Sequence, residues 1–428
     1  MSDNKTIAIC GGEVVIDNQL QAADVVIRDG VVAEVGQNVN CDGATVIDAT
    51  GAWVMPGFVD IHTHLREPGR TEAETVETGS RAAALGGYTA VVAMPNTEPA
   101  IDNLGIIEQI RSAAKAALCE VAVSACITRG RGGKELVNFA SLSAAGVHIY
   151  TDDGNGVQDT ALMLHALQYA SDLDVVLAQH CEDESLSAGG FMHEGAVSSR
   201  LGIGGIPPEA EELMVMRDIA LSRKAQVAMH FLHLSTKRSV ELVRDAKAAG
   251  MNVTAEATPH HFTLTDEALN SFDPNFRVNP PLRSAPDRAA VIEGLKDGTI
   301  DAIATDHAPH APELKELPLT EAPCGMLGLE TAASLANSEL QLGAVELSRL
   351  LSINPARIAR LHETHGQIAV GRPANITVFD PNAEWTVDPM QLASKARNTP
   401  FAGRDMTGRT RHTIFNGEVV VADSKAQR

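Results

Sequence analysis

The sequence lacks long apolar runs, secretory signals and paired cysteines. No apolar run in its 428 residues approaches the roughly 20 residues that a membrane-spanning helix requires. Residues 1–6 are polar and precede an alternating segment, which is unlike a signal peptide. The six cysteines have no CxxC spacing and indicate reduced thiols instead of a disulfide framework (Cys10, Cys41, Cys119, Cys126, Cys181, Cys324). We expect a globular, cytoplasmic protein.

Basic residues are also scarce, since 34 Lys and Arg stand against 55 Asp and Glu and give a formal net charge of −21. Nucleic acids and anionic membranes bind basic surfaces, so this charge argues against both as partners. An anionic small molecule fits only where metals and arginine make the site locally positive. No GxGxxG loop follows the first strand, which argues against a dinucleotide-binding, doubly wound sheet.

The two ends of the chain differ in pattern from the middle. Residues 1–54 and 367–428 contain short strands with turn signals, and we expect them to form one small β-sandwich-like domain. Residues 55–366 alternate apolar strands with helical stretches, which is typical of repeated βα units. The strand before His62 and seven further candidates predict an α/β fold with a (β/α)8 TIM barrel (88–94, 121–127, 147–150, 175–179, 227–232, 251–255, 300–304).

Residues 56–69 are the most informative segment, because an apolar strand there delivers His62 and His64 and then Arg66. Side chains at i and i+2 of a strand point the same way, so both imidazoles face one site. An isolated pair of this kind is more often two ordinary buried histidines. Most of the other predicted strands also end in polar or metal-binding residues, and this agreement favours a metal site at the carboxyl ends of the strands (Asn96, Asp152, Asp153, His180, His233, Glu256, Asp306).

Four histidines and two aspartates exceed the ligands that one ion needs. Two metals with a bridging carboxylate are the simpler interpretation, and divalent ions roughly 3.5–4 Å apart can polarise one carbonyl together. That is the chemistry of amide hydrolysis or of its reverse. Spacing alone does not decide whether Asp152 or Asp153 is the bridge. Cys181 beside His180 is interpreted as filler, because water-activating sites prefer nitrogen and oxygen ligands.

These strand ends resemble the amidohydrolase superfamily, and within its cyclic amidase branch five motifs resemble class I dihydroorotase over nearly the whole chain. The motifs are His64-Leu65-Arg66-Glu67-Pro68-Gly69, Met94-Pro95-Asn96-Thr97, Thr151-Asp152-Asp153-Gly154, Asn279-Pro280-Pro281-Leu282-Arg283 and residues 304–310. The resemblance implies two zinc ions. One would be held by His62, His64 and Asp306 and the other by His180 and His233, with Asp153 as the bridge. Many relatives bridge with a carboxylated strand-four lysine, but the nearest lysine here is Lys134, well before that strand.

The resemblance also implies a reaction and its substrate contacts. Dihydroorotases interconvert N-carbamoyl-L-aspartate and L-dihydroorotate in pyrimidine biosynthesis, and Asp306 would shuttle the proton of the ring nitrogen. Arg66 suits the free carboxylate, because a guanidinium binds a carboxylate through two parallel hydrogen bonds. The family pattern adds further substrate contacts: His64, Asn96 and His310 beside Arg66, and Asn279, Cys324 and Gly325 at the amide edge. Ring closure consumes a proton, so lower pH should favour it.

Two other functions stay open. A hydantoinase or allantoinase is the nearest enzymatic alternative, but it would be expected to carry the strand-four lysine and to lack the Arg66, Asn96 and His310 clamp. A catalytically inactive scaffold subunit of aspartate carbamoyltransferase is the other, but such proteins lose metal ligands. The sequence is compatible with a homodimer and with a complex with that transferase.

Some neighbouring residues receive supporting roles. His260 and His261 at a strand end are interpreted as support for the metal ligands. His307 is expected to point away from Asp306. Residues 309–325 contain four prolines and form either a lid or a long connection.

Overall fold

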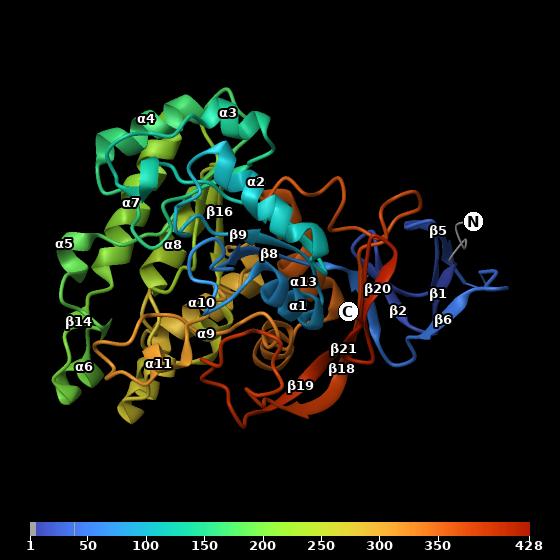
Figure 1. Ribbon diagram of the computed structural model, residues 1–428. Helices are drawn as coiled ribbons and strands as arrows, with labels where there is room; N and C mark the ends of the chain where they lie inside the picture. Colours follow the sequence, from blue (N-terminus) through green and yellow to red (C-terminus); the bar gives the residue numbers. More distant parts are fainter. Residues whose placement is uncertain (1–5, 38) are drawn as a thin grey trace.

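The computed structural model describes residues 6–37 and 39–428. Residues 1–5, most of the polar amino end, lie outside the described residues, as does residue 38. Figure 1 shows a large body of strands and helices with a smaller group of strands beside it, and that group contains strands from both ends of the chain. This is an α/β protein. Of the helices in the described ranges, none is long and apolar enough to cross a membrane.

Eight parallel strands form the centre of the large body. They are β8 (Phe58–Thr63), β9 (Tyr88–Ala93), β10 (Glu120–Val123), β11 (Ile149–Tyr150), β12 (Val176–Gln179), β15 (Met229–Phe231), β16 (Val253–Ala257) and β17 (Ala302–Ile303). Pairing runs β8-β9-β10 in one sheet and β11-β12-β15-β16-β17 in another. Parallel bridges from Ala125 to Tyr150 and from Thr63 to His307 join the two sheets at both edges. The carboxyl ends of these strands therefore lie on one side of the body.

At least one helix follows each of these strands. They are α1 (Val76–Gly86), α2 (Leu104–Ala113), α3 (Phe139–Ala144), α4 (Thr160–Ala170), α5 (Glu184–Ser187), α6 (Ala196–Leu201), α7 (Glu209–Ala225), α8 (Lys237–Ala248), α9 (Pro259–Thr263), α10 (Ala285–Asp297), α11 (Pro312–Lys315), α12 (Ala332–Leu335), α13 (Ala344–Ser348) and α14 (Asn354–Ile358). Thr75, Asn103 and Thr236 accept backbone N–H groups in the first turns of α1, α2 and α8, which fixes where these helices begin. The βα alternation predicted from the sequence is present.

Some strands are shorter than the sequence predicts. The predicted strand 121–127 ends as β10 at Val123, because the N–H groups of Ile127 and Thr128 donate to Oδ1 of Asp152 (2.8 and 3.0 Å). The apolar segment 7–15, within the amino-terminal part predicted to contain short strands, breaks at Gly11, whose φ of 79° is left-handed, into β1 (Ile7–Cys10) and β2 (Glu13–Ile16). In both places the apolar pattern alone predicts a longer strand. The strand ends earlier because the backbone N–H groups bond to a side chain in one case and because the chain turns at a glycine in the other.

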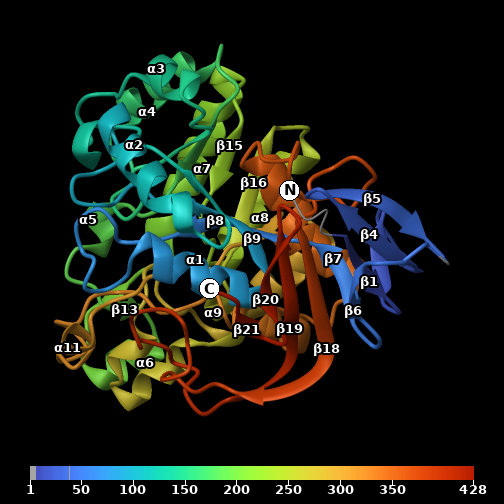
Figure 2. The same cartoon turned by 45° about the vertical axis from the view of Figure 1, so that its right-hand side comes forward.

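Both ends of the chain build the smaller group of strands. One sheet has the order β21-β20-β19-β18-β7-β2-β3 and the other β5-β4-β1-β6. The additional strands are β3 (Gln19–Ala22), β4 (Asp24–Arg28), β5 (Val31–Gly36), β6 (Thr45–Asp48), β7 (Trp53–Pro56), β18 (Ile376–Thr386), β19 (Asp405–Phe415), β20 (Glu418–Ala422) and β21 (Lys425–Ala426). Figure 2 shows β7, β18 and β19 close together, and Val54 of β7 pairs with Val378 of β18. Segments more than 300 residues apart thus share one sheet.

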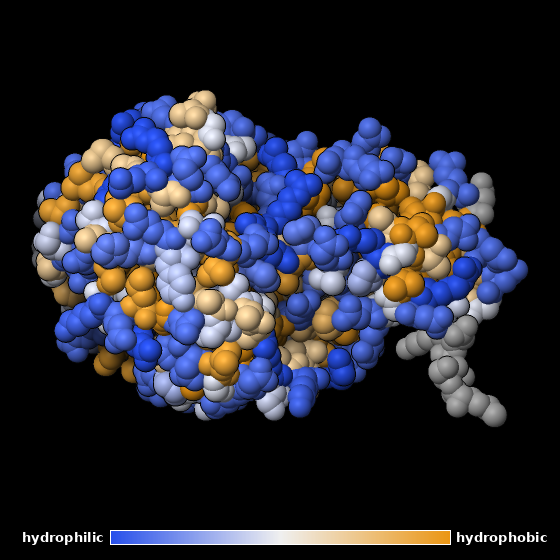
Figure 3. Space-filling view, turned by 90° about the horizontal axis from the view of Figure 1, so that it is seen from above, coloured by the Kyte–Doolittle hydropathy of each residue, from blue (hydrophilic) through white to orange (hydrophobic). Residues whose placement is uncertain are grey.

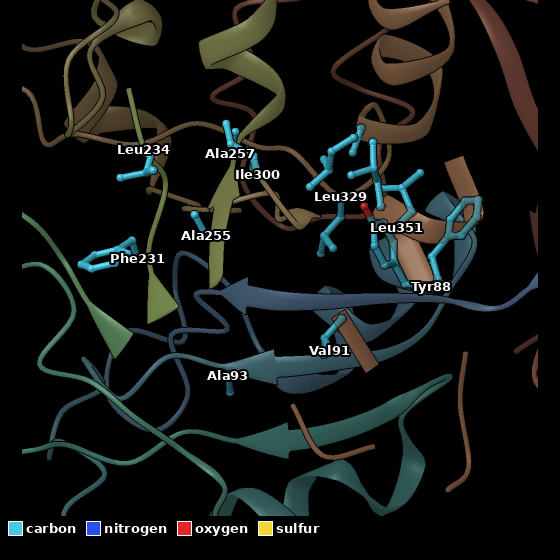
Figure 4. Packing of buried hydrophobic residues seen from close by; sticks show 14 of the residues in the cluster. Tyr88, Val91, Ala93, Phe231, Leu234, Ala255, Ala257, Ile300, Leu329 and Leu351 are labelled. Carbon is cyan, nitrogen blue, oxygen red and sulfur yellow. The ribbon is translucent and has the colours of Figure 1, made fainter. Parts of the chain in front are cut away.

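The central strands are buried on both faces, as parallel strands covered by helices are. Successive residues of β9 illustrate this, because Val91 and Ala93 pack in one apolar cluster and Ala90 and Val92 in another. Figure 4 shows Val91 and Ala93 with other buried side chains of the first cluster. Because both faces of these strands are packed, the strands hold the groups at their carboxyl ends in place.

The surface of the molecule is mixed, and hydrophilic and hydrophobic residues are interspersed over the face drawn in Figure 3.

Candidate metal centre and substrate pocket

All six residues predicted as metal ligands lie together at the carboxyl ends of the central strands. They are at most 7% exposed, and each belongs to or closely follows one of β8, β11, β12, β15 and β17 (His62, His64, Asp153, His180, His233, Asp306). The ligand atoms of His62, His64 and Asp153 lie within 4.8 Å of one another, as do those of Asp153, His180 and His233. Oδ1 of Asp306 lies 2.9 Å from Nε2 of His64 and 3.5 Å from Nε2 of His62. Two groups of ligands therefore share Asp153.

Asp153 and its neighbour Asp152 have different surroundings. Oδ1 of Asp153 lies 3.5 Å from both His62 Nε2 and His180 Nδ1, and 3.7 Å from His233 Nε2. Asp152 instead accepts the N–H groups of Ile127 and Thr128 and the Thr128 hydroxyl. Asp152 is thus engaged in holding the loop after β10, and Asp153 faces the histidines.

The orientation of His62 leaves one ring nitrogen for a cation. Nδ1 lies 2.6 Å from Oε1 of Glu256, so this nitrogen carries the hydrogen and donates a hydrogen bond to the carboxylate. Nε2 is buried and has no hydrogen-bond partner among the described residues, although Asp153 and Asp306 lie 3.5 Å away. A histidine that donates one N–H to a carboxylate and turns the other nitrogen to a cluster of acids has the arrangement of a metal ligand. The residues present fit a metal ion.

The electrostatics of the cluster agree with that fit. Burial disfavours the charged form of His62, but Asp153, Glu256 and Asp306 outweigh burial and raise its pKa well above the usual value. Burial also opposes the protonation of His180, yet its contacts with Asp153 and Glu182 raise its pKa to about 10. Both shifts arise because carboxylates impose a negative potential on the rings. A divalent cation bound between the rings would neutralise that potential.

Three residues at the site have left-handed backbone. The φ angles are 60° at Arg66, 31° at His233 and 47° at Asp306. Non-glycine residues adopt this conformation at a cost of order 1–3 kcal/mol, and such strain gathers at functional sites. All three residues lie just after the ends of strands β8, β15 and β17, where the side chains of the site begin.

A cavity of about 300 Å³ opens beside the cluster. Its walls include five of the six metal-ligand candidates, all except His62. They also include every predicted substrate residue (His64, Arg66, Asn96, Asn279, His310, Cys324, Gly325). Arg66 is 7% exposed and donates from Nε to the carbonyl of Pro309 (3.1 Å). Burial lowers the pKa of Arg66 to about 10, so the guanidinium is still charged at neutral pH. The cavity therefore has one acidic, metal-competent wall and one cationic wall.

The other predicted substrate residues are already bonded to the protein. Oδ1 of Asn96 accepts from His64 Nδ1 (2.8 Å), and its Nδ2 donates to Oδ2 of Asp153 (3.4 Å). Nε2 of His310 donates to the carbonyl of Cys324 (2.7 Å), and burial together with Arg66 lowers the pKa of His310 to about 2. His310 is therefore neutral. Nδ2 of Asn279 lies 3.3 Å from His180 Nε2, next to the second group of ligands.

Sequence reasoning assigned the supporting histidines by position alone. His307 lies next to Asp306 but contacts Glu74 through Nε2 (3.3 Å), so it points away from the cluster as expected. His261 lies 3.0 Å from the carbonyl of Pro280, and burial lowers its pKa to about 3. Residues 309–325 contain helix α11 and supply Cys324 and Gly325 to the cavity wall.

Three residues with a clear place at the site received no role from the sequence. Arg70 lines the same cavity as Arg66, and its position directly after the first motif was the available signal. Glu256 was noted only as the end of a strand, yet it holds His62. Asn398 lies about 90 residues beyond His310 in the sequence but accepts its N–H, and no sequence pattern pointed to it.

Comparisons with known proteins agree with this geometry. The Dihydro-orotase-like family matches residues 51–239, and the Amidohydrolase family matches residues 241–421. A dihydroorotase of Pelotomaculum thermopropionicum is 49% identical over 97% of this chain and 99% of its own. A dihydroorotase of Halalkalibacterium halodurans is 44% identical over 99% of this chain and 100% of its own.

Solved structures of related enzymes share the fold. L-Hydantoinase (dihydropyrimidinase) from Arthrobacter aurescens superposes with a TM-score of 0.89 at 24% identity and covers 99% of this chain and 98% of its own. A D-hydantoinase gives a TM-score of 0.86 at 25% identity over 98% and 96%. The fold and the buried histidine-carboxylate cluster define a metal-dependent amidohydrolase, an enzyme that hydrolyses cyclic amides. More closely, the chain belongs to the dihydroorotase family, whose substrate is a small molecule.

Proposed function

We propose that this chain is a class I dihydroorotase, which interconverts N-carbamoyl-L-aspartate and L-dihydroorotate in pyrimidine biosynthesis. The observation that carries the proposal is a cavity in which a metal-competent cluster faces the buried guanidinium of Arg66. A cyclic amide with one free carboxylate matches both walls. Relatives named dihydroorotase, at 44–49% identity over nearly the whole chain, support the same reaction.

The metal cofactor is proposed to be two zinc ions. One would be held by His62, His64 and Asp306 and the other by His180 and His233, with Asp153 shared between them. The donor set consists of imidazole nitrogens and carboxylate oxygens, which suits zinc and leaves positions open for catalysis. When bound, the ions supply Lewis acidity, which polarises the amide carbonyl and lowers the pKa of water.

Asp306 is proposed as the proton shuttle. Burial raises the pKa of this carboxyl, but His62 and His64 outweigh burial and hold it below the usual value, so Asp306 is ionised and able to accept a proton. In hydrolysis, Asp306 takes a proton from the attacking water and delivers it to the ring nitrogen as the C–N bond breaks. In ring closure, it takes the proton of the ureido nitrogen. Closure consumes one proton overall, and lower pH favours it.

The substrate is proposed to lie with its carboxylate on Arg66. A guanidinium and a carboxylate form a charge-assisted pair, and burial strengthens it because water does not screen the charges. Asn96 and His310 flank the carboxylate, and His64 lies between it and the metals. The amide edge of the ring is proposed to meet Asn279 and the backbone at Cys324 and Gly325.

The architecture of the family is proposed for the chain as a whole. We infer that residues 55–366 form a (β/α)8 barrel, because eight parallel strands are joined through both edge bridges. Residues 1–54 and 367–428 would form the companion β domain, which the shared sheet of β7 and β18 supports. The cysteines are free thiols in the structure, which suits a reducing cytoplasm.

The test of the proposed function is turnover of L-dihydroorotate by purified protein, with metal content measured on the same sample. We expect ring opening with about two zinc ions per chain. Hydantoins and allantoin are assayed in parallel, because the solved neighbours include hydantoinases. Faster turnover of a hydantoin than of L-dihydroorotate would show that the proposed substrate is wrong. A metal-loaded but inactive chain that co-purifies with aspartate carbamoyltransferase would indicate a scaffold subunit.

A further inference from the structure

Asn398 joins two segments of the cavity wall. It is 3% exposed and lies between β18 and β19, in the carboxyl-terminal part of the chain. Its Oδ1 accepts the N–H of His310 (3.1 Å), and its Nδ2 donates to the carbonyls of Ala308 (3.0 Å) and Gly325 (3.1 Å). Its own carbonyl accepts the N–H of Leu327 (3.0 Å). One buried amide thus ties residues 308–310 to residues 325–327.

The segments that Asn398 joins are those that carry the cationic wall. Pro309, between two residues bonded to Asn398, accepts the Nε–H of Arg66 through its carbonyl (3.1 Å). His310 reaches across to the second segment and donates to the carbonyl of Cys324 (2.7 Å). The direction of the Arg66 side chain therefore depends on a backbone that Asn398 holds.

The two segments are packed so closely that no side chain fits between them at Gly325. A Cβ atom at Gly325 would lie 2.6 Å from Cβ and 2.9 Å from the carbonyl oxygen of Ala308, and the φ of Gly325 is 133°. Only glycine fits there. The two segments are therefore in close contact, and a shift of residues 308–310 moves both Pro309 and the Cys324–Gly325 backbone.

A second contact places the same carboxyl-terminal segment against the catalytic side. The Ser394 hydroxyl and the Lys395 N–H (3.1 Å) donate to the carboxylate of Glu74. Glu74 in turn lies 3.3 Å from Nε2 of His307, which neighbours Asp306. Residues 394–398 thus fix the loop after β17 from two directions.

We propose that Asn398 is a positioning residue that sets the carboxylate-binding wall of the cavity by holding residues 308–310 in register with residues 325–327. The inference rests on the proposed function, because it assigns the substrate carboxylate to Arg66. An asparagine is required at this position, because the site needs one acceptor for His310 and two donors for the carbonyls of Ala308 and Gly325. An aspartate would keep the acceptor and place a negative charge against two carbonyls.

The experiment compares the zinc-loaded, full-length enzyme with its Asn398→Ala and Asn398→Asp variants. Asn375→Ala is the matched control, because Asn375 is 2% exposed and also bonds through both amide atoms, to the Asn416 N–H (2.8 Å) and the Thr364 carbonyl (3.0 Å). The readouts are kcat and KM for L-dihydroorotate, zinc content, and hydrogen exchange of the peptide that contains His310.

In both Asn398 variants we expect KM to rise about tenfold while kcat changes about threefold or less, since the lost bonds orient a binding group and not the reacting atoms. Zinc content should not change. Exchange at His310 should accelerate in Asn398→Ala and stay slow in Asn398→Asp, which retains the acceptor. Asn375→Ala should lower stability and leave KM as it is.

Two results would overturn the inference. A wild-type KM in the Asn398 variants would show that the wall does not depend on this amide, and an equal rise of KM in Asn375→Ala would show a general loss of stability. A wild-type enzyme that does not turn over dihydroorotate would instead refute the proposed function. The exchange measurement distinguishes the two failures, because it reports whether Asn398 holds the segment without requiring activity.

Discussion

Nδ1 of His62 lies 2.6 Å from Oε1 of Glu256, and both side chains are fully buried. The second oxygen of Glu256 lies 3.0 Å from Nε2 of His230, whose Nδ1 is 2.8 Å from the Thr254 hydroxyl. A chain of hydrogen bonds therefore runs across β15 and β16 to the first candidate metal ligand. Its effect is to fix the tautomer of His62, so that Nε2 faces Asp153 with its lone pair.

Replacement of Glu256 by Gln should weaken metal binding. The amide can still contact His62, but it removes the negative charge that makes the imidazole a stronger ligand, and losses of this kind lower metal affinity about 10- to 100-fold. Activity should fall at limiting zinc and recover when zinc is added. Zinc titration of the metal-stripped protein measures the change. Glu330→Gln is the control, because it neutralises a partly buried carboxyl outside the cluster. Equal zinc affinity in wild type and Glu256→Gln would contradict the role of Glu256.

Replacement of Asp306 by Ala or Asn should remove nearly all turnover. Either change deletes the group that moves the proton, and Ala also deletes a ligand, so kcat should fall by about 10³-fold or more. Asp301→Asn is the matched control. Asp301 is close to the same strand but accepts from the Ala255 N–H (2.9 Å) and pairs with Lys247, so the change should affect stability and leave kcat near its wild-type value. Ordinary turnover by Asp306→Asn would refute the shuttle.

The sequence was sufficient to predict that the candidate metal ligands lie close together. In parallel βα units the carboxyl ends of the strands lie on one side, so residues at those ends meet although they are far apart in the chain. His62 and Asp306 illustrate this, since 244 positions separate them and 3.5 Å separates His62 Nε2 from Asp306 Oδ1. The period of two along β8 also explains why His62 and His64 face the same site.

The roles of the individual aspartates and of Asn398 depend on contacts between distant segments, and no local sequence pattern predicts these contacts. Strand β11 contains only Ile149 and Tyr150, so both aspartates that follow it lie in irregular backbone, where the alternation of a strand no longer predicts direction. Their surroundings separate them, because the loop after β10 uses Asp152 for its own N–H groups. Asn398 is hidden from sequence reasoning for a similar reason, since its partners are backbone groups and carry no residue signature.

The two arginines of the cavity should contribute unequally to substrate binding. Arg66→Ala should raise KM for L-dihydroorotate about 100-fold, because it removes a buried, charge-assisted pair with the carboxylate. Arg70 has a side chain that is 42% exposed and lies 3.5 Å from Glu98, so water and salt screen its charge. Arg70→Ala should therefore raise KM less than about threefold. Steady-state kinetics at low and high ionic strength measure both effects, and an unchanged KM in Arg66→Ala would exclude this residue as the carboxylate site.

Glu330 should make the stability of the fold depend on pH. Burial raises the pKa of Glu330 from an ordinary value of 4.5 to about 7. Between these values the folded state retains a proton that the unfolded state releases. The stabilisation is therefore fully present below about pH 4.5 and is lost as the pH rises through about 7.

Glu330→Gln replaces the protonated acid by a neutral amide of similar shape and should abolish this dependence. Relative to wild type, the variant should gain about 2 kcal/mol in free energy of unfolding between pH 5.5 and pH 8, because each pH unit in the titration window is worth about 1.4 kcal/mol. Urea unfolding of both proteins at the two pH values, with equal zinc, measures the difference. Other titrating groups cancel in the comparison, since both proteins contain them. A difference that is the same at both pH values would show that Glu330 titrates normally in the folded state.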